Sequence, residues 1–232
     1  MARTMMLVCG VLSPIVWLAG DVIASLRYPG YSYVDFSVSE LSALGASTRA
    51  FVVWVGVVSV LLELALAAAL WLVSAGRRGL RTTAVLMFAH AGLNLAIPVI
   101  NVFTPFATMH TREDLGASGA QAASDIGHLI YVAVTLVLIF LMIGFASSAF
   151  GRPWRVYSFA TIAVMLTFGA WAGSFAPRVA ANLPTPGLGL IERANVYSFY
   201  LWFALLAVMV LRIERSAPRP TGGGAVGVSE QH

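Results

Sequence analysis

Six stretches of about 20 mostly apolar residues run along this chain, and each is long enough to cross the hydrocarbon core of a bilayer as a helix. They cover approximately residues 5–26, 50–75, 82–103, 126–149, 156–176 and 194–213. Only 10% of the 232 residues are charged, whereas soluble domains carry about 25% charged residues. The sequence therefore predicts an all-α membrane protein, a bundle of six transmembrane helices over residues 1–213.

The two ends of the chain need separate interpretations. Arg3 and the apolar stretch after it resemble a signal peptide, with Leu18-Ala19-Gly20 in the place of a cleavage site. The stretch is long for a signal peptide and the cleavage site matches poorly, so we interpret it as the first span. Residues 214–232 are rich in Pro and Gly and are predicted to form a disordered cytoplasmic tail.

The arginines predict the orientation of the bundle. The chain has no lysine, and nine of its 14 arginines lie before the first span, after the second and fourth spans, or from the end of the sixth span onward. Because short loops rich in arginine stay in the cytoplasm, we expect both termini to be cytoplasmic and the protein to be a multi-pass protein of the cell membrane. The outer side carries the long connections 27–49, 104–125 and 177–193, and such loops often hold functional sites.

Several classes of function are excluded by missing motifs. Cys9 is the single cysteine, so an internal disulfide is impossible, and no Cys/His spacing indicates a zinc site. The scattered arginines do not form the stripe typical of nucleic-acid binding. Neither a Gly-rich phosphate loop nor a G-x-S-x-G motif occurs. We expect no nucleic-acid partner, no metal and no cofactor; His90, His128 and Asp125 are suitable metal ligands, but no metal-binding helix motif contains them.

Two acidic residues lie within the predicted spans. Glu63 is near the centre of the second span, where a carboxyl group must face the bundle interior and find a partner or a proton. It is either a functional proton donor or a hydrogen-bonding group that joins two helices. Asp21 lies near the outer end of the first span and is either a hydrated interfacial residue or part of a polar cluster at the outer side.

The third span carries a polar stripe. His90, Asn94 and Asn101 follow one another at intervals of four and seven residues and so share nearly one face of a helix. Pro98 lies beside them and loosens the backbone. Such a stripe either lines a cavity or consists of polar side chains that are satisfied within the core.

Charged residues open the fourth and sixth predicted spans. Asp125 is either the N-cap of its helix or a carboxylate that orients His128, three residues further on. Glu192 suits the positive end of a helix dipole. Arg193 is less expected there, so we predict that it pairs with an acid or contacts a polar ligand.

Aromatic residues give a weaker signal. Trp171 lies between Gly169 and Gly173, a G-x-x-x-G pair that is typical of close helix packing. Tyr197 either lines a cavity or packs in the core, which is the commoner use of a tyrosine.

The segment YPGYSYVDFSVSELSALGASTRAF after the first span resembles the domain-of-unknown-function 998 family, six-span membrane proteins of bacteria and archaea. The resemblance continues through His128 and through GLGLIERANVYSFYLW, and so covers roughly residues 5–213. It implies that the site lies on the outer side, where its motifs fall. The positions it marks are Ser39, Glu40, His128, Glu192 and Arg193.

A looser resemblance is to the small integral-membrane terpene cyclases, which use membrane-embedded carboxyl groups as proton donors. Their fungal members have seven spans, and this chain shows six. The resemblance implies proton-initiated cyclisation of a prenylated, lipid-like substrate, with Glu63 as the first candidate for the acid. The further candidate acids are Asp21, Glu40 and Glu192, and His128 is expected to take the final proton. The residues expected to bind substrate are Ser39, His90, Asn94, Asn101, Asp125, Trp171, Arg193 and Tyr197.

Two other functions stay open at this point. A non-catalytic bundle would use the same polar groups to bind a lipid or to carry protons or solutes. An assembly subunit would use the G-x-x-x-G pair as a docking face. The expected partners are the bilayer and a hydrophobic small molecule, and the sequence indicates no particular partner protein.

Overall fold

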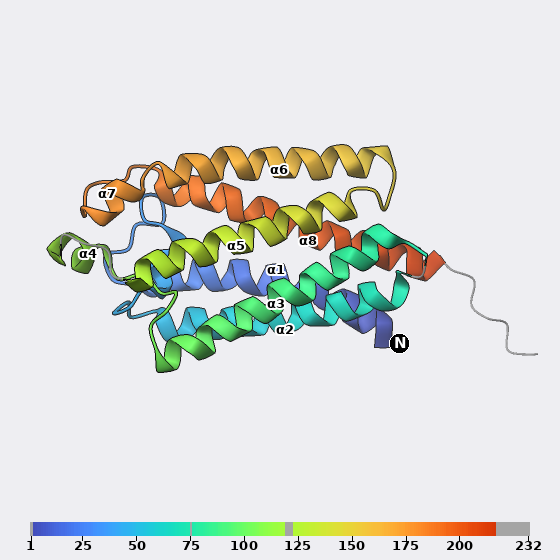
Figure 1. The fold of residues 1–232 in the computed structure, drawn as a ribbon, viewed down its shortest axis with the longest axis horizontal. Helices are drawn as coiled ribbons and strands as arrows, with labels where there is room; N and C mark the ends of the chain where they lie inside the picture. Colours follow the sequence, from blue (N-terminus) through green and yellow to red (C-terminus); the bar gives the residue numbers. More distant parts are fainter. Residues whose placement is uncertain (1, 75, 119–122, 217–232) are drawn as a thin grey trace, which may run out of the picture.

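The computed structural model describes residues 2–74, 76–118 and 123–216 and shows a bundle of long, roughly parallel helices (Figure 1). The long helices are α1 (Ala2–Arg27), α2 (Arg49–Val73), α3 (Arg78–Phe103), α5 (Ala123–Ala146), α6 (Arg152–Gly173) and α8 (Leu188–Ser216). The short ones are the 3-10 helix η1 (Val38–Ser42), α4 (Arg112–Ser118) and α7 (Ala176–Ala180). Six helices are long and apolar enough to cross a membrane, which confirms the predicted fold class.

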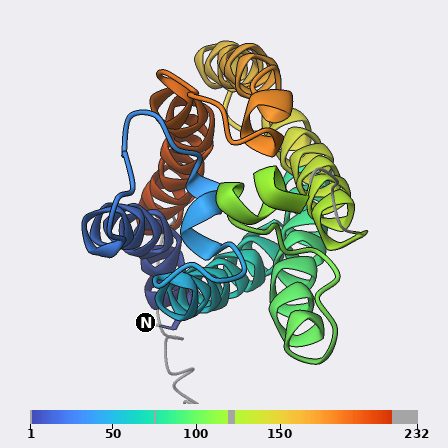
Figure 2. The ribbon, with the colours of Figure 1, turned by 90° about the vertical axis from the view of Figure 1, so that its left-hand side faces the viewer.

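The long helices form a ring in the order α1, α2, α3, α5, α6, α8 (Figure 2). α8 packs against both α1 and α6 and so closes the ring. α5 and α6 make far fewer contacts with each other than any other neighbouring pair in the ring. The ring therefore has one loosely packed seam, between α5 and α6.

Small residues on α1 explain its close packing against α2. A Cβ atom at Gly10 would lie 2.7 Å from the Leu66 side chain, and one at Gly20 would collide with Val55. At the same interface Ser13 Oγ donates to the Ser59 carbonyl oxygen at 2.9 Å. Close approach between small residues, with hydroxyl groups bonded across the interface, is a common way to join helices in a bilayer.

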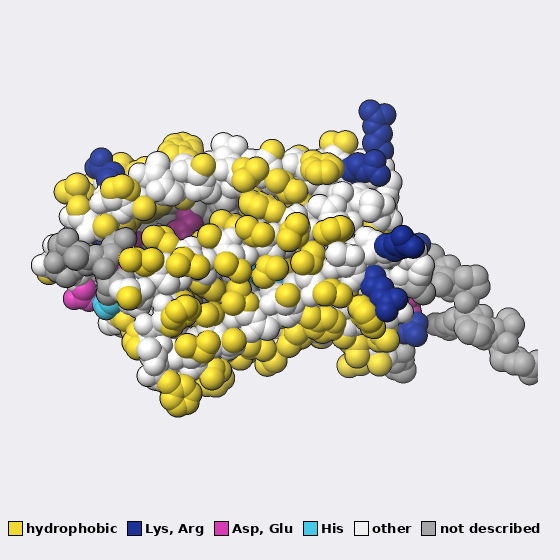
Figure 3. Space-filling view, viewed as in Figure 1, with side chains coloured by type: hydrophobic (Ala, Val, Ile, Leu, Met, Phe, Trp, Pro, Cys, Tyr) yellow, Lys and Arg dark blue, Asp and Glu magenta, His cyan; other side chains and the backbone are white. Residues whose placement is uncertain are grey.

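The sides of the bundle are apolar, and its ends are polar. Figure 3 shows hydrophobic side chains along the length of the molecule and arginines gathered at the end where α2 joins α3 and α5 joins α6. The exposed arginines of these two connections are Arg77, Arg78, Arg81, Arg152 and Arg155. Arg3 lies 3.6 Å from Glu214 at the same end, so the start of α1 and the last turns of α8 are neighbours. We call this the inner end and the opposite one the outer end.

The predicted spans were correct in number but wrong at their boundaries. α3, α5, α6 and α8 begin at residues 78, 123, 152 and 188, whereas hydropathy predicts 82, 126, 156 and 194. At α5 and α8 the helical backbone continues through Asp125, Glu192 and Arg193, because these side chains find partners inside the protein. Glu192 and Arg193 consequently lie inside α8 rather than at its start. The first turns of α3 and α6 instead carry exposed arginines at the inner end. α8 also continues to Ser216, and the rest of the expected tail, residues 217–232, lies outside the described residues.

The outer end is covered by the connections. η1, α4 and α7 lie across the outer end of the ring in Figure 2. A single β-bridge joins Leu44 to His110, and the Leu44 amide donates to the Met109 carbonyl oxygen at 2.8 Å. We call these covering segments, residues 28–48, 104–118 and 174–187, the outer cap.

The orientation of the bundle can be tested by labelling single cysteines in intact cells. In a Cys9→Ala background we expect a membrane-impermeant maleimide to label Glu113→Cys in the outer cap and not Arg78→Cys at the inner end, because arginine-rich loops stay in the cytoplasm. Both positions are exposed, so both should react after the membrane is permeabilised. Labelling of Arg78→Cys and not of Glu113→Cys in intact cells would show that the orientation is the reverse of the predicted one.

Candidate functional site

A cavity of about 440 Å³ lies inside the ring at its outer half, within the range of about 300–1,000 Å³ typical of small-molecule sites. Its lining on α8 runs from Leu188 to Tyr200, a depth of about 18 Å at the helical rise of 1.5 Å per residue. Most of the wall is apolar. The apolar side chains that line it include Leu129, Val132, Leu136, Ile139, Met165, Val179, Val196 and Phe199.

The cavity lies behind the loose seam between α5 and α6, since both helices contribute to its lining. Figure 3 shows a hollow between these helices on the apolar side of the molecule, with an acidic side chain visible inside it. Gly169 and Gly173 of α6 both line the cavity. The G-x-x-x-G pair is therefore part of the cavity wall. Trp171 points the other way, stacks on Phe168 and is 53% exposed.

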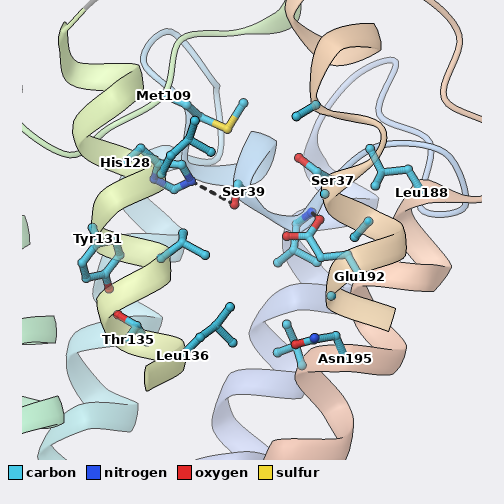
Figure 4. A pocket seen from close by; sticks show the side chains of 18 of the residues that line it. Ser37, Ser39, Met109, His128, Tyr131, Thr135, Leu136, Leu188, Glu192 and Asn195 are labelled. Carbon is cyan, nitrogen blue, oxygen red and sulfur yellow. Dashed lines mark hydrogen bonds between the residues drawn. The ribbon is translucent and has the colours of Figure 1, made fainter. Parts of the chain in front are cut away.

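Two ionisable side chains face the cavity from opposite walls near its outer end. Figure 4 shows His128 on α5 and Glu192 on α8, with Ser37 and Ser39 of the outer cap between them. His128 Nε2 lies 3.3 Å from Ser39 Oγ. Glu192 Oε2 accepts the Val38 amide at 2.8 Å. Three of the positions marked by the family resemblance, Ser39, His128 and Glu192, are thus brought together at one site.

Arg193 and Asp21 form a buried ion pair behind this site. Arg193 Nε and Nη2 donate to the two carboxylate oxygens of Asp21, each at 2.8 Å, and the two side chains are 3% and 1% exposed. The guanidinium group also donates to the Tyr33 and Gly189 carbonyl oxygens, at 2.8 and 3.2 Å. Tyr197 donates its hydroxyl to Asp21 at 2.5 Å. These groups join α1, α8 and the outer cap, and none of Asp21, Arg193 and Tyr197 lines the cavity.

Glu40 forms a second buried ion pair within the outer cap. Arg112 Nε and Nη2 donate to its two carboxylate oxygens, at 2.5 and 2.8 Å, and the Ser37 amide donates to Oε2 at 2.7 Å. The Arg112 guanidinium also lies over the Phe36 ring, 3.9 Å from its centroid. Glu40 thereby fixes η1 to α4 and holds the neighbouring Ser39 at the cavity.

Asp35 fastens the outer cap to the start of α8. Its carboxylate accepts the Gly187 amide at 3.0 Å and the Ser32 hydroxyl at 2.9 Å. The Gly187 amide, and after it the Ser32 hydroxyl, hold the pKa of Asp35 below its usual value. Because the native pKa is depressed, this carboxylate stabilises the fold above its unfolded pKa of about 3.9. That contribution is lost as the pH falls through the native pKa.

Glu63 and His90 are paired deep in the bundle. His90 Nδ1 lies 2.8 Å from Glu63 Oε1, and the two side chains are 8% and 6% exposed. Glu63 lines a smaller pocket of about 70 Å³ next to the main cavity, while His90 and Asn94 line both. Tyr131 donates its hydroxyl to Asn94 Oδ1. The polar stripe of α3 thus lines the cavity at His90 and Asn94.

The remaining residues of the predicted site, Asn101 on α3 and Asp125 on α5, bond to the outer cap. Asn101 Oδ1 accepts the Phe106 and Ala107 amides at 2.9 and 3.0 Å, and Asn101 does not line the cavity. Asp125 lines the cavity, and its carboxylate accepts the His110 amide at 2.8 Å and lies 3.0 Å from His110 Nδ1.

Asp125 therefore bonds to His110 rather than to His128, and it lies in the first turn of α5. His110 was not predicted as a partner because it lies in a connection with no regular pattern. In the described part of the chain, no group of three His, Cys, Asp or Glu side chains is arranged to hold a metal ion.

Comparison with known proteins identifies a family and adds no activity. A sequence model of the family described as "Protein of unknown function (DUF998)" matches residues 11–209, which is most of the chain. No curated protein and no solved structure matches it. The resemblance to terpene cyclases therefore stays a prediction.

We expect Asp21→Asn and Arg193→Gln each to destabilise the protein by about 3–5 kcal/mol, because each leaves one buried charge without its partner. The measurement is the thermal midpoint of unfolding of the purified protein in detergent micelles. Arg155→Gln, an exposed arginine at the inner end, is the matched control and should unfold like the wild type. Equal midpoints for all four proteins would show that the ion pair does not hold the outer end together.

Proposed function

Because this chain belongs to the DUF998 family, whose description names no activity, we propose its function from the cavity: an enzyme that protonates and cyclises a prenylated, lipid-like substrate inside the membrane. One observation carries the proposal. A half-buried carboxyl group, Glu192, and an imidazole, His128, face each other across a mainly apolar cavity behind the α5–α6 seam.

The cavity favours a substrate that arrives from the bilayer. The seam lies on the apolar side of the bundle (Figure 3), and the lining has polar groups mainly toward its outer end and along the α3 side. An amphiphile fits this arrangement with its polar end near His128 and its apolar chain pointing inward. Of the common membrane chains, a prenyl chain offers alkenes that an acid can protonate, whereas a saturated acyl chain offers none.

Glu192 is the best candidate for the proton donor. In the described part of the chain, Asp21 and Glu40 are each paired with an arginine, and Glu63 is paired with a histidine. Glu192 accepts one backbone amide, from Val38, and has no ion-pair partner among the described residues. A carboxyl group that loses water and gains no counter-charge favours its neutral form, the form that can donate a proton. We therefore place Glu192 ahead of Glu63, Asp21 and Glu40 as the acid.

The other groups at the cavity suit the substrate and the cation that protonation creates. His128 and Ser39 share the outer end with Glu192 and are placed to hydrogen-bond the polar group of the substrate. The rings of Trp17 and Tyr200 line the cavity deeper in and stack with centroids 4.7 Å apart. Aromatic faces stabilise positive charge, and an apolar cavity keeps water from quenching it.

We also propose that the bilayer is the cell membrane, with the outer end facing away from the cytoplasm. The arginines at the inner end support this orientation, since loops rich in arginine remain cytoplasmic. In this orientation the outer cap separates the polar end of the cavity from the external water.

The proposal is tested by supplying farnesyl hydroquinone, and its epoxide at the alkene nearest the ring, to membranes that contain the protein. We expect cyclised isomers of one of these probes by mass spectrometry, and Glu192→Gln should lower the rate at least about 100-fold, the usual contribution of a general acid. Glu113→Gln, an exposed acid of the outer cap, is the control and should keep the wild-type rate. Full activity of Glu192→Gln would remove Glu192 as the donor. Binding without any product would instead indicate a lipid-binding protein, and proton or solute flux in liposomes a transporter.

A second test fills the cavity without disturbing the fold. A Cβ atom at Gly173 meets no other atom within 4 Å, and Gly173 lines the cavity. We expect Gly173→Leu to fold normally and to lose crosslinking to a farnesyl hydroquinone that carries a photoactivatable diazirine. Gly92→Leu, at an exposed glycine of α3 that also has open space, is the matched control. Equal crosslinking of both variants would place the ligand outside this cavity.

A further inference from the structure

The pair of Glu63 and His90 has no role in the mechanism above, although both side chains are buried in the middle of the bundle. His90 Nδ1 lies 2.8 Å from Glu63 Oε1. Within the described residues, the groups that line the adjoining small pocket are otherwise uncharged. They are Ser13 and Trp17 of α1, Gly56, Ser59 and Val60 of α2, Asn94 of α3, and Phe199, Tyr200 and Phe203 of α8.

This contact fixes which nitrogen of His90 is free. When the Glu63 carboxylate accepts the proton of Nδ1, the other nitrogen, Nε2, carries none and can accept one. A carboxylate that holds a histidine in this way also stabilises the imidazolium that forms when Nε2 is protonated. Glu63 and His90 thus have the geometry of an oriented base.

His90 also faces the substrate cavity. His90 lines both the main cavity and the small pocket, and Nδ1 is the ring nitrogen with a hydrogen-bond partner among the described residues. The ring contacts Phe199 of α8, with centroids 6.2 Å apart. Phe199 follows Glu192 by seven residues on the same helix, a distance of about 10 Å along its axis. The free nitrogen and the proposed acid are therefore well separated along the cavity.

We propose that His90 is the catalytic base that removes the final proton, at the deep end of the cavity, and that Glu63 is its positioning residue. This inference rests on the proposed cyclisation and adds the proton acceptor to it. It also gives Glu63 a role different from that of the acid expected from the sequence.

The complete reaction is balanced without an oxidant or a reductant. The carboxyl proton of Glu192 adds to one alkene carbon, and the electron pair of a second alkene closes a carbon–carbon bond onto the resulting cation. A C–H bond beside the last cation then breaks, its electrons form a new double bond, and the proton moves to Nε2 of His90. The product is an isomer of the substrate. After it leaves, His90 returns its proton to water and Glu192 takes one up at the outer end.

The first experiment measures binding of two hydroquinones that differ only at the chain end. One ends in a trimethylammonium group, which imitates the cation, and the other in the neutral tert-butyl group of the same shape. We expect the wild type to bind the charged probe more tightly than the neutral one. In Glu63→Gln the ratio of the two dissociation constants should fall about tenfold, the value of a charge-assisted contact. The neutral probe should bind both proteins equally, which also shows that the variant is folded. Glu113→Gln is the control for loss of an acid elsewhere.

The second measurement is independent of any ligand. In protein labelled with ¹⁵N-histidine, the His90 signals, assigned by their loss in His90→Gln, should report a proton on Nδ1 and none on Nε2. Glu63→Gln should change this distribution. An unchanged distribution, together with an unchanged preference for the charged probe, would overturn the role of the pair while leaving the proposed function intact. Failure of both probes to bind the wild type would instead overturn the proposed function.

Discussion

The bidentate ion pair between Arg193 and Asp21 is the contact on which the outer half of the molecule depends. A bilayer offers no water to a guanidinium or carboxylate group, so each must be satisfied within the protein. Arg193 does this with donors to Asp21 and to the carbonyl oxygens of Tyr33 and Gly189. Because these acceptors belong to α1, the outer cap and α8, one side chain fixes three segments relative to one another. Glu192, the residue before Arg193 on α8, is held at the cavity by the same arrangement.

The partner of each carboxyl group distinguishes the acids that hold the structure together from the acid proposed to take part in the reaction. Glu40 and Asp21 each have a bidentate arginine partner, and both oxygens of each carboxyl group are used in that contact. Glu63 is paired with His90, and its proposed role is to position the imidazole ring. Among the residues that the structure describes, the hydrogen-bond partner of Glu192 is a backbone amide, that of Val38. These four carboxyl groups thus differ in what they can do because their partners differ.

Hydropathy predicted the spans because about 20 apolar residues in a row have few alternatives to a transmembrane helix. The same signal placed Glu192 and Arg193 at the start of the last helix, although α8 begins at Leu188. Hydropathy is summed over neighbouring residues, so it contains no information about a distant partner that neutralises a charge. Partners were beyond prediction for a related reason. Arg112 lies 72 positions from Glu40 and Arg193 lies 172 positions from Asp21, and no local pattern joins such positions. Glu63 and His90 were each singled out, but only the fold shows that they meet.

The helix α6, on one side of the loose seam, lines the cavity but takes no part in the ion pairs of the outer end. The ion pairs that hold the outer end lie on α1, α8 and the outer cap, whereas α6 presents Gly169, Ala172 and Gly173 to the cavity. Substitutions on α6 can therefore alter the shape of the chamber while the fastening of the fold stays untouched. Gly173 is the clearest such position, because an added Cβ there meets open space and a larger side chain would reshape the cavity with every ion pair left in place.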